Sequence, residues 1–249
     1  MSTVAEFLVR AAREFRRGGY VFTGFHWPVL AARLAARLPG APFAQVYEGG
    51  AICHGIGAQV PTSTTDYPAY ADVLGFAGST ADILLALVWR CDRVVLDAVN
   101  VDLRGRVNAT AIGPYDRPKV RLAGGGGAAD AAAAARELVL LHGGNDPRRL
   151  VAEVEHVTAA PRPGVPVTLH TRWGVLDLGE RPVLRQLTGA GDTDGFLAHL
   201  AALGVDTGPA VVAAPVSPAE LTAARRVLTE AADRGYRAAA AALAEERER

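Results

Sequence analysis

Apolar residues recur at helical spacing near the amino end of the chain. The apolar positions recur every three to four residues and stop at Gly18 and Gly19, which end the predicted helix. These positions are Val4, Phe7, Leu8, Ala11, Ala12 and Phe15. The short run at 20–23 that follows is typical of a buried strand.

A second strand is predicted shortly after the first. Pro28 fits the first position of a helix at 29–38, which Pro39 and Gly40 end, and residues 43–47 read as a strand. Strand, helix and strand in this order form a βαβ unit, whose strands are parallel and whose crossover is right-handed. Both strands therefore end at the same edge of a sheet.

The same alternation continues along the chain. Ser79 and Asp82 resemble a capping box, and Ser217 with Glu220 forms another, with Pro218 at the first helical position. The other expected elements are a helix at 83–89, strands at 93–97 and 138–141, a hairpin at 100–113 turning at 104–105, an alanine-rich helix after 124–127, and a hairpin at 165–178 turning at 172–174.

These elements predict an α/β fold, namely an open, mainly parallel sheet with flanking helices. The segment after Ser217 is expected to be helical. We find no repeat, long linker or shift in composition that would mark a boundary. We therefore expect a single domain over residues 1–249.

Composition and charge restrict the classes of function. The 249 residues are 50% hydrophobic, and 26 basic side chains balance 26 acidic ones. Nucleic-acid grooves and polybasic membrane patches need a cationic surplus, so neither partner is expected. No apolar run reaches the roughly 18 residues of a membrane helix, and the amino end lacks the order of a signal peptide. We expect a cytoplasmic protein that acts on small molecules.

A carboxylate follows the second predicted strand directly. Glu48 stands before Gly49 and Gly50, at the carboxyl end of a parallel strand, where open α/β sheets bind their ligands. The turn that holds Gly24, Phe25 and His26 leaves the neighbouring strand at the same edge and would form a facing wall. The two glycines would let a bulky substrate approach the backbone. The alternative is that Glu48 is a solvated turn residue.

Four glycines at 124–127 precede a predicted helix. The segment 124–130 opens a helix, where free backbone N–H groups and the helix dipole would favour an anion or a developing oxyanion. The segment lacks the Lys-Ser/Thr pair of a phosphate loop, so a flexible turn is the alternative.

Histidine and cysteine give weaker signals. His26 and His54 fall near the proposed edge, but no histidine pair has metal-ligand spacing, so no metal is expected. Cys53 and Cys91 form no CxxC motif, which fits reduced thiols. Cys53 has no identifiable base, and we interpret it as a packing residue.

Five segments, in order, resemble the β subunit of family I coenzyme A transferases, the glutaconate CoA-transferase group. Glu48 lies in a segment similar to the family's nucleophile segment, which ends Glu-Ser-Gly or Glu-Asn-Gly. The segment 101–113 looks like the family's Asp-x-x-Gly-Asn-x-Asn-x-Thr-x-x-Gly hairpin. The remaining similar segments are Thr23 and Gly24 with Pro28, 117–119, and 121–128. The resemblance covers residues 18–178.

The resemblance implies a transferase that moves coenzyme A between an acyl-CoA and a carboxylic acid, with Glu48 as the nucleophile. Coenzyme A is then a substrate, and no separate cofactor is implied. Gly126, Gly127 and Ala128 would stabilise the oxyanion or bind CoA, and Gly24, Phe25, His26, Gly49, Gly50 and His54 would line the substrate pocket. It also implies a separate α subunit of like fold, in a heterodimer that commonly pairs again as α2β2.

Two other hypotheses stay open, one for a different enzyme activity on the same fold and one for a subunit without catalytic activity. Related heterodimers on this fold hydrolyse a ring of an acyl-CoA or decarboxylate a glutaconyl-type acyl-CoA, and their β subunits lack the glutamate that Glu48 matches. A non-catalytic subunit that stabilises its partner is the third hypothesis. The chain departs from the family at Ala129, Arg106 and 98–100, which leaves its substrate contacts open.

Overall fold

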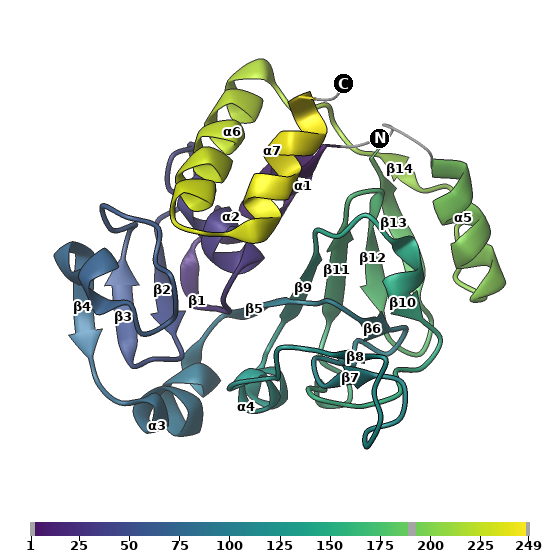
Figure 1. The fold of residues 1–249 in the computed structure, drawn as a ribbon, viewed down its shortest axis with the longest axis horizontal. Coiled ribbons are helices and arrows are strands. Elements are labelled where there is room, and N and C mark those ends of the chain that lie inside the picture. The colour runs from purple at the N-terminus through teal and green to yellow at the C-terminus, as the bar shows by residue number, and fades with distance from the viewer. Residues whose placement is uncertain (1–2, 189–192, 248–249) are drawn as a thin grey trace.

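One large mixed sheet organises the molecule, which we describe from a computed structural model that places residues 3–188 and 193–247. Within these residues ten strands form the sheet, in the order β14-β13-β12-β11-β9-β5-β1-β2-β3-β4 (Figure 1). Two smaller sheets pair β6 with β10 and β7 with β8. The strands are β1 (Gly19–Thr23), β2 (Phe43–Tyr47), β3 (Ala51–His54), β4 (Leu74–Ala77), β5 (Arg93–Asp97), β6 (Val101–Asp102), β7 (Ala111–Ile112), β8 (Val120–Arg121), β9 (Leu138–His142), β10 (Leu150–Val151), β11 (Val167–Thr171), β12 (Gly174–Leu178), β13 (Val183–Leu187) and β14 (Val211–Val212).

Helices cover both faces of this sheet. The α-helices are α1 (Val4–Phe15), α2 (Trp27–Ala35), α3 (Thr80–Asp82), α4 (Ala128–Ala134), α5 (Thr193–Ala202), α6 (Pro218–Asp233) and α7 (Arg237–Arg247). The short helical turns are η1 (Tyr67–Ala69), η2 (Ala71–Val73), η3 (Ile83–Leu87), η4 (Val88–Arg90) and η5 (Pro147–Arg149).

The central strands β11, β9, β5, β1 and β2 are parallel, whereas β12, β13, β3 and β4 join through antiparallel pairs. This arrangement confirms the expected α/β fold. Strands β1 and β2 pair in parallel, so the predicted βαβ unit is also confirmed. The carboxyl ends of β5, β1 and β2 consequently lie side by side at one edge.

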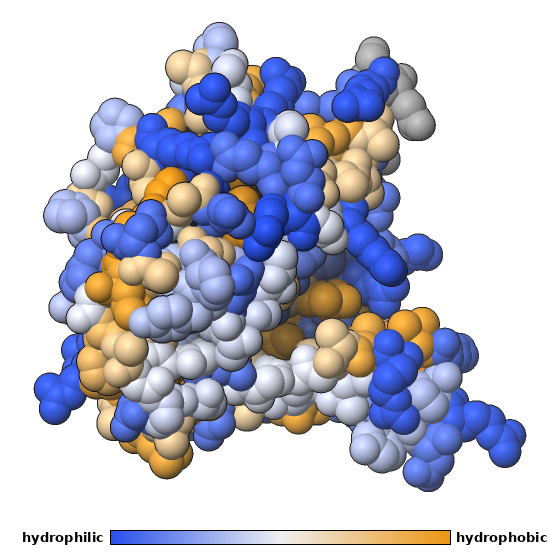
Figure 2. Space-filling view, turned by 60° about the vertical axis from the view of Figure 1, so that its left-hand side comes forward, coloured by the Kyte–Doolittle hydropathy of each residue, from blue (hydrophilic) through white to orange (hydrophobic). Residues whose placement is uncertain are grey.

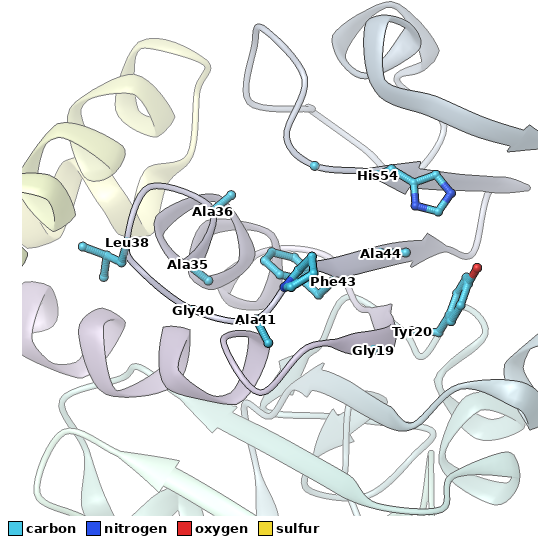
Figure 3. A pocket seen from close by; sticks show the side chains of 12 residues that line it. Gly19, Tyr20, Ala35, Ala36, Leu38, Gly40, Ala41, Phe43, Ala44 and His54 are labelled. Carbon is cyan, nitrogen blue, oxygen red and sulfur yellow. The ribbon is translucent and has the colours of Figure 1, made fainter.

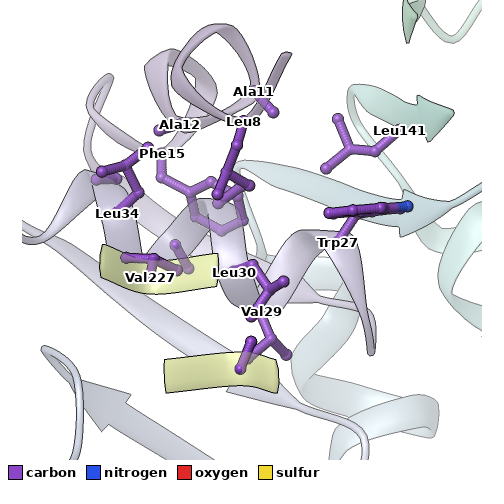
Figure 4. Packing of buried hydrophobic residues seen from close by; sticks show 14 of the residues in the cluster. Leu8, Ala11, Ala12, Phe15, Trp27, Val29, Leu30, Leu34, Leu141 and Val227 are labelled. Atoms are coloured by element: carbon purple, nitrogen blue, oxygen red, sulfur yellow. The ribbon is translucent and has the colours of Figure 1, made fainter. Parts of the chain in front are cut away.

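Consecutive residues of the central strands point to opposite faces, as the period of two requires. Val21 and Val95 pack on one face with helices α1, α2 and α6, where Leu8, Leu30 and Val227 meet (Figure 4). Phe22 and Val94 pack on the other face with α4, α5 and the η3 turn. Each face of the sheet thus has its own buried cluster.

Capping residues define three helix starts, and those at Ser217 and Ser79 are as the sequence predicts. Ser217 and Glu220 form a complete capping box before α6, and Ser79 and Asp82 form one before α3. Thr3 accepts a hydrogen bond from the N–H of Glu6 at the start of α1. These caps satisfy N–H groups that the first helical turn leaves unpaired.

Several sequence expectations need correction. The helix expected at 83–89 is a π turn followed by a 3₁₀ turn, η3 and η4. The hairpin expected at 100–113 is reduced to one bridge, Val101 to Val107, because β6 pairs with β10 and β7 pairs with β8 instead.

No helix in residues 3–188 and 193–247 is long and apolar enough to cross a membrane.

Candidate functional site

Three neighbouring strand ends and a glycine loop line one pocket of about 650 Å³. Strand β1 leads into Gly24, Phe25 and His26, β2 leads into Glu48, and β5 ends at Asp97. The opposite wall comes from 122–126 and Ala128, before and at the start of α4. The fold therefore brings Glu48, the β1 turn and the glycine loop together, as expected from the sequence.

The Glu48 carboxylate is half-buried and packs against the glycine loop. A Cβ added to Gly126 would lie 3.2 Å from both carboxylate oxygens, and one added to Gly127 would lie 3.1 Å from Cδ. No hydrogen bond or ion pair engages this carboxylate within the described residues. It is therefore a carboxylate in a pocket wall with its lone pairs free to act on a ligand.

The glycine loop presents backbone donors near this carboxylate. The N–H of Ala128 donates to the carbonyl of Gly125, at 2.9 Å, so the expectation that Ala128 supplies a free donor is wrong. The N–H groups of Gly126 and Gly127 have no partner among the described residues. Two donors, rather than three, are therefore available to an anionic oxygen at this point.

Gly49 and Gly50 do not line the pocket, which corrects the expectation that they admit substrate to the backbone. A Cβ on Gly49 would lie 2.2 Å from the carbonyl oxygen of Thr64, and one on Gly50 would lie 2.2 Å from that of Gly78. Both glycines are required because other parts of the chain approach them closely. Their effect on Glu48 is to allow the tight turn that follows it.

His54 lies at the opposite edge, so its expected place in the substrate pocket is wrong. Strand β3 runs antiparallel to β2 and pairs His54 with Ala44, near the start of β2, whereas Glu48 follows the end of β2. His54 and Tyr20 border a different cavity of about 470 Å³, whose other walls are mostly alanine, glycine and proline (Figure 3). That cavity contains no carboxylate, and it lies at the amino ends of β1 and β2.

His26 and Asp97 both line the pocket and contact each other. Nδ1 of His26 lies 3.2 Å from Oδ2 of Asp97, within ion-pair distance but without the geometry of a hydrogen bond. The ring stacks on Tyr236 with an interplanar angle of 14°. The backbone of His26 has φ +74°, and no other non-glycine residue in 3–188 and 193–247 has positive φ.

Asp97 was not singled out from the sequence, although a signal was present. It is the last residue of a predicted strand, and β5 is parallel to β1, so its carboxylate reaches the same edge as Glu48. Ser63 and Thr158 also line the pocket. They come from irregular segments whose course no local pattern predicts.

The remaining pocket wall is largely apolar. Its side chains include Phe22, Leu96, Val99, Val107 and Leu122. Glu48, Asp97 and His26 are the ionisable side chains among its described lining residues. On the face shown in Figure 2 the surface is hollowed near its centre, and apolar side chains are visible inside the hollow. The described residues contain no group of three His, Cys, Asp or Glu side chains placed to hold a metal ion.

Both cysteines are buried away from this pocket. Burial raises the pKa of the Cys53 thiol to about 12, and it also raises that of Cys91 to about 12. Neither is a thiolate at neutral pH, which agrees with the interpretation of Cys53 as a packing residue.

Sequence comparison identifies a curated relative. The chain is 34% identical over 135 residues to one subunit of the 3-oxoadipate CoA-transferase of Pseudomonas knackmussii. The match covers 49% of this chain and 47% of the relative, so the chain spans about half the length of the curated relative it matches. No family model matches the chain.

Solved structures match over almost the whole chain. The decarboxylase AibA/AibB superposes with a TM-score of 0.70 at 28% identity, covering 91% of this chain and 95% of that one. The glutaconate coenzyme A-transferase of Acidaminococcus fermentans superposes with a TM-score of 0.75 at 22% identity, covering 90% and 93%. At that identity the second match establishes the fold alone.

Proposed function

We propose that this chain is the β subunit of an acyl-CoA:carboxylate CoA-transferase, and the similarity to one subunit of the 3-oxoadipate CoA-transferase supports this proposal. The observation that carries this proposal is the half-buried Glu48 carboxylate in the pocket wall, which has no partner among the described residues. It packs against the backbone of Gly126 and Gly127, whose N–H groups are also unpaired. A carboxylate nucleophile needs this combination of restricted hydration and access.

In the proposed reaction, a carboxylate oxygen of Glu48 attacks the thioester carbonyl carbon of an acyl-CoA. The new C–O bond gives an acyl-glutamyl anhydride, the C–S bond breaks, and the CoA thiolate leaves with the electron pair. The thiolate then attacks the Glu48 carbonyl carbon, releases the first acid as its carboxylate and leaves a glutamyl-CoA thioester. A second carboxylate reverses both steps, so ping-pong kinetics are expected.

The glycine loop would stabilise the tetrahedral intermediates of these steps. Each attack places a negative charge on a carbonyl oxygen, and donors fixed in advance favour that charge. The backbone of Gly126 and Gly127 packs against the Glu48 carboxylate, and the N–H groups of both glycines have no partner among the described residues. Loss of one such donor costs on the order of 3 kcal/mol in the transition state.

A partner chain is part of this proposal. The curated relative is named as one subunit of its enzyme, and the structural neighbour AibA/AibB is named as two components. We infer that an α subunit of like fold joins this chain in a heterodimer or an α2β2 assembly. The α subunit would supply the remaining surface that binds CoA and the acid.

The test is the exchange of a labelled carboxylic acid into acyl-CoA by the assembled complex. Glu48→Ala should abolish exchange and leave assembly intact, and mass spectrometry should detect CoA on the tryptic peptide that contains Glu48 in the unsubstituted complex. Exchange above a few per cent in Glu48→Ala would contradict the proposal. Glu48→Gln needs longer observation, because deamidation would restore the carboxylate.

Decarboxylation is the second candidate, and the match to AibA/AibB at 28% identity over 91% of the chain supports it. It predicts release of CO2 from an acyl-CoA that carries a second carboxylate, with no acceptor acid present. The hydrolytic alternative predicts a ring-opened product under the same conditions. Label exchange that requires both an acyl-CoA and an acid separates the transferase from both.

A further inference from the structure

The contact between His26 and Asp97 has no task in the transfer chemistry proposed above. A carboxylate nucleophile carries no proton that must be removed, and the thiolate leaves as an anion. Yet the pocket that holds Glu48 also contains an imidazole whose Nδ1 faces a carboxylate at 3.2 Å. An imidazole oriented in this way by an acid is the arrangement of a general base.

Four features fix the position of the imidazole. Asp97 faces Nδ1, the ring of Tyr236 stacks on one side at 5.7 Å, and Trp27 makes an edge contact at 5.3 Å. Tyr236 is itself held by a hydrogen bond from its hydroxyl to the carbonyl of Pro61. The fourth feature is the backbone of His26, which belongs to the sharp turn from β1 into α2.

That turn is costly for a residue with a side chain. His26 has φ +74° and ψ −114°, a conformation that glycine adopts readily and that residues with a Cβ rarely adopt. Histidine caps no helix N–H with its side chain here. Strain of this kind persists where the surrounding structure over-determines it, and such residues cluster at functional sites. The side chain, rather than the backbone, is what histidine contributes at this position.

The second ring nitrogen is available to a ligand. Nε2 has no hydrogen-bond partner among the described residues. Unlike Nδ1, it is not a buried atom left without a partner. Nδ1 lies 3.2 Å from Oδ2 of Asp97, and with its proton on Nδ1 neutral His26 presents a lone pair on Nε2. Because His26 lines the pocket, this lone pair can receive a proton from a molecule bound there.

We propose that His26, oriented by Asp97, is the general base for a thioester hydrolysis in this pocket when no acceptor acid is bound. The inference rests on the proposed function only in that the pocket receives an acyl-CoA. A water oxygen forms a bond with the thioester carbonyl carbon as Nε2 takes a proton from that water. The C–S bond then breaks, and the proton passes from Nε2 to the departing thiolate. The products are the free acid and CoA, and no other reactant is consumed.

The experiment measures two rates on the assembled complex, which are acyl-CoA consumption without any acid and label exchange with an acid. His26→Gly suits the positive φ and leaves a space for added imidazole. We expect the ratio of hydrolysis to exchange to fall by about 100-fold, within the range for loss of a general base. Added imidazole should restore hydrolysis, which a purely structural role of His26 would not produce.

His26→Gln provides a second variant, because glutamine keeps polarity but is no base, and its hydrolysis should fall similarly. Asp97 is a positioning residue, so Asp97→Asn alone should lower the hydrolysis rate. Added to His26→Gly, it should not lower that rate further, because the base is already absent. His54→Gln, at the opposite edge of the sheet, is the matched control and should leave the ratio unchanged.

The inference is overturned if the complex hydrolyses no acyl-CoA or if the His26→Gln complex keeps the full hydrolysis rate. It is also overturned if added imidazole does not restore hydrolysis in the His26→Gly complex. Label exchange tests the proposed transfer separately. A complex that hydrolyses acyl-CoA through His26 and exchanges no label would contradict the transfer and support the inference.

Discussion

The carboxylate of Glu48 lies against the backbone of Gly126, so closely that a Cβ on that glycine would come within 3.2 Å of both oxygens. The two residues are 78 positions apart in the chain, as their numbers show. Strand β2 fixes the first, and the turn before α4 fixes the second. The distance between the Glu48 carboxylate and the glycine loop is therefore set by the packing of α4 on the sheet.

Gly126→Ala should therefore impair transfer. The added methyl group would displace the carboxylate, and φ +50° at this position is unfavourable for alanine. A displacement of about 1 Å in a reacting group can lower a rate about 100-fold, and we expect a loss of that order in label exchange.

Gly164→Ala is the matched control for that substitution. Gly164 also has positive φ, +82°, but an added Cβ there would meet nothing within 4 Å. Both variants should lower the melting temperature slightly, and only Gly126→Ala should lower exchange. Equal exchange in the two variants would show that contact with Glu48 is unimportant.

The cysteines should be unreactive in the folded protein. Burial raises the pKa of Cys53 to about 12, and its side chain is fully buried. Thiol reagents attack the thiolate, so Ellman's reagent should titrate neither cysteine in buffer and both in guanidinium. Cys53→Ala should retain label exchange. Rapid labelling of Cys53 in the native complex would contradict its interpretation as a packing residue.

Local sequence patterns predicted the parts of the fold that local physics determines. The capping box at Ser217, Pro28 at the start of α2 and the apolar run at β2 each specify an element within a few residues. Parallel pairing of β1 and β2 then follows from connectivity. This reasoning was enough to predict that Glu48 and the turn at His26 lie at the same edge of the sheet.

Long-range contacts account for what the sequence did not reveal. The reversal of β3 against β2 moves His54 to the far edge, although it stands only six positions after Glu48. The N–H of Ala128 is taken by the carbonyl of Gly125, which no helix-start pattern indicates. The contact of His26 with Asp97 depends on the pairing of β1 with β5, across 71 positions of the chain.

Asp102 is predicted to be essential for stability. Its fully buried carboxylate accepts hydrogen bonds from the N–H groups of Arg104 and Arg106 and from Nε of Arg106. Asp102→Ala would leave these donors unpaired, at a cost of about 3 kcal/mol in the free energy of unfolding. Urea denaturation measures this loss. Glu153→Ala removes only the exposed partner of Arg106 and should cost less than about 1 kcal/mol.

Glu14 should make stability depend on acid pH. Burial alone would raise its pKa, but hydrogen bonds from His170 and Arg17 and their charges lower it to about 2. A carboxyl whose pKa is lower in the folded state stabilises that state at pH values above the pKa of the unfolded chain, which is about 4.3 for glutamate. This contribution, about 3 kcal/mol, is lost as the pH falls from about 4.5 towards 2.

Urea denaturation of Glu14→Gln at several pH values tests this expectation. The variant should be less stable than the unsubstituted chain at pH 6, and the difference should shrink as the pH approaches 2, because Glu14 is then protonated and resembles glutamine. Glu180 is exposed and serves as the control, since Glu180→Gln should change stability little at any pH. A difference for Glu14→Gln that stays constant between pH 6 and pH 2.5 would mean that packing, rather than the charge of Glu14, stabilises the contact with His170.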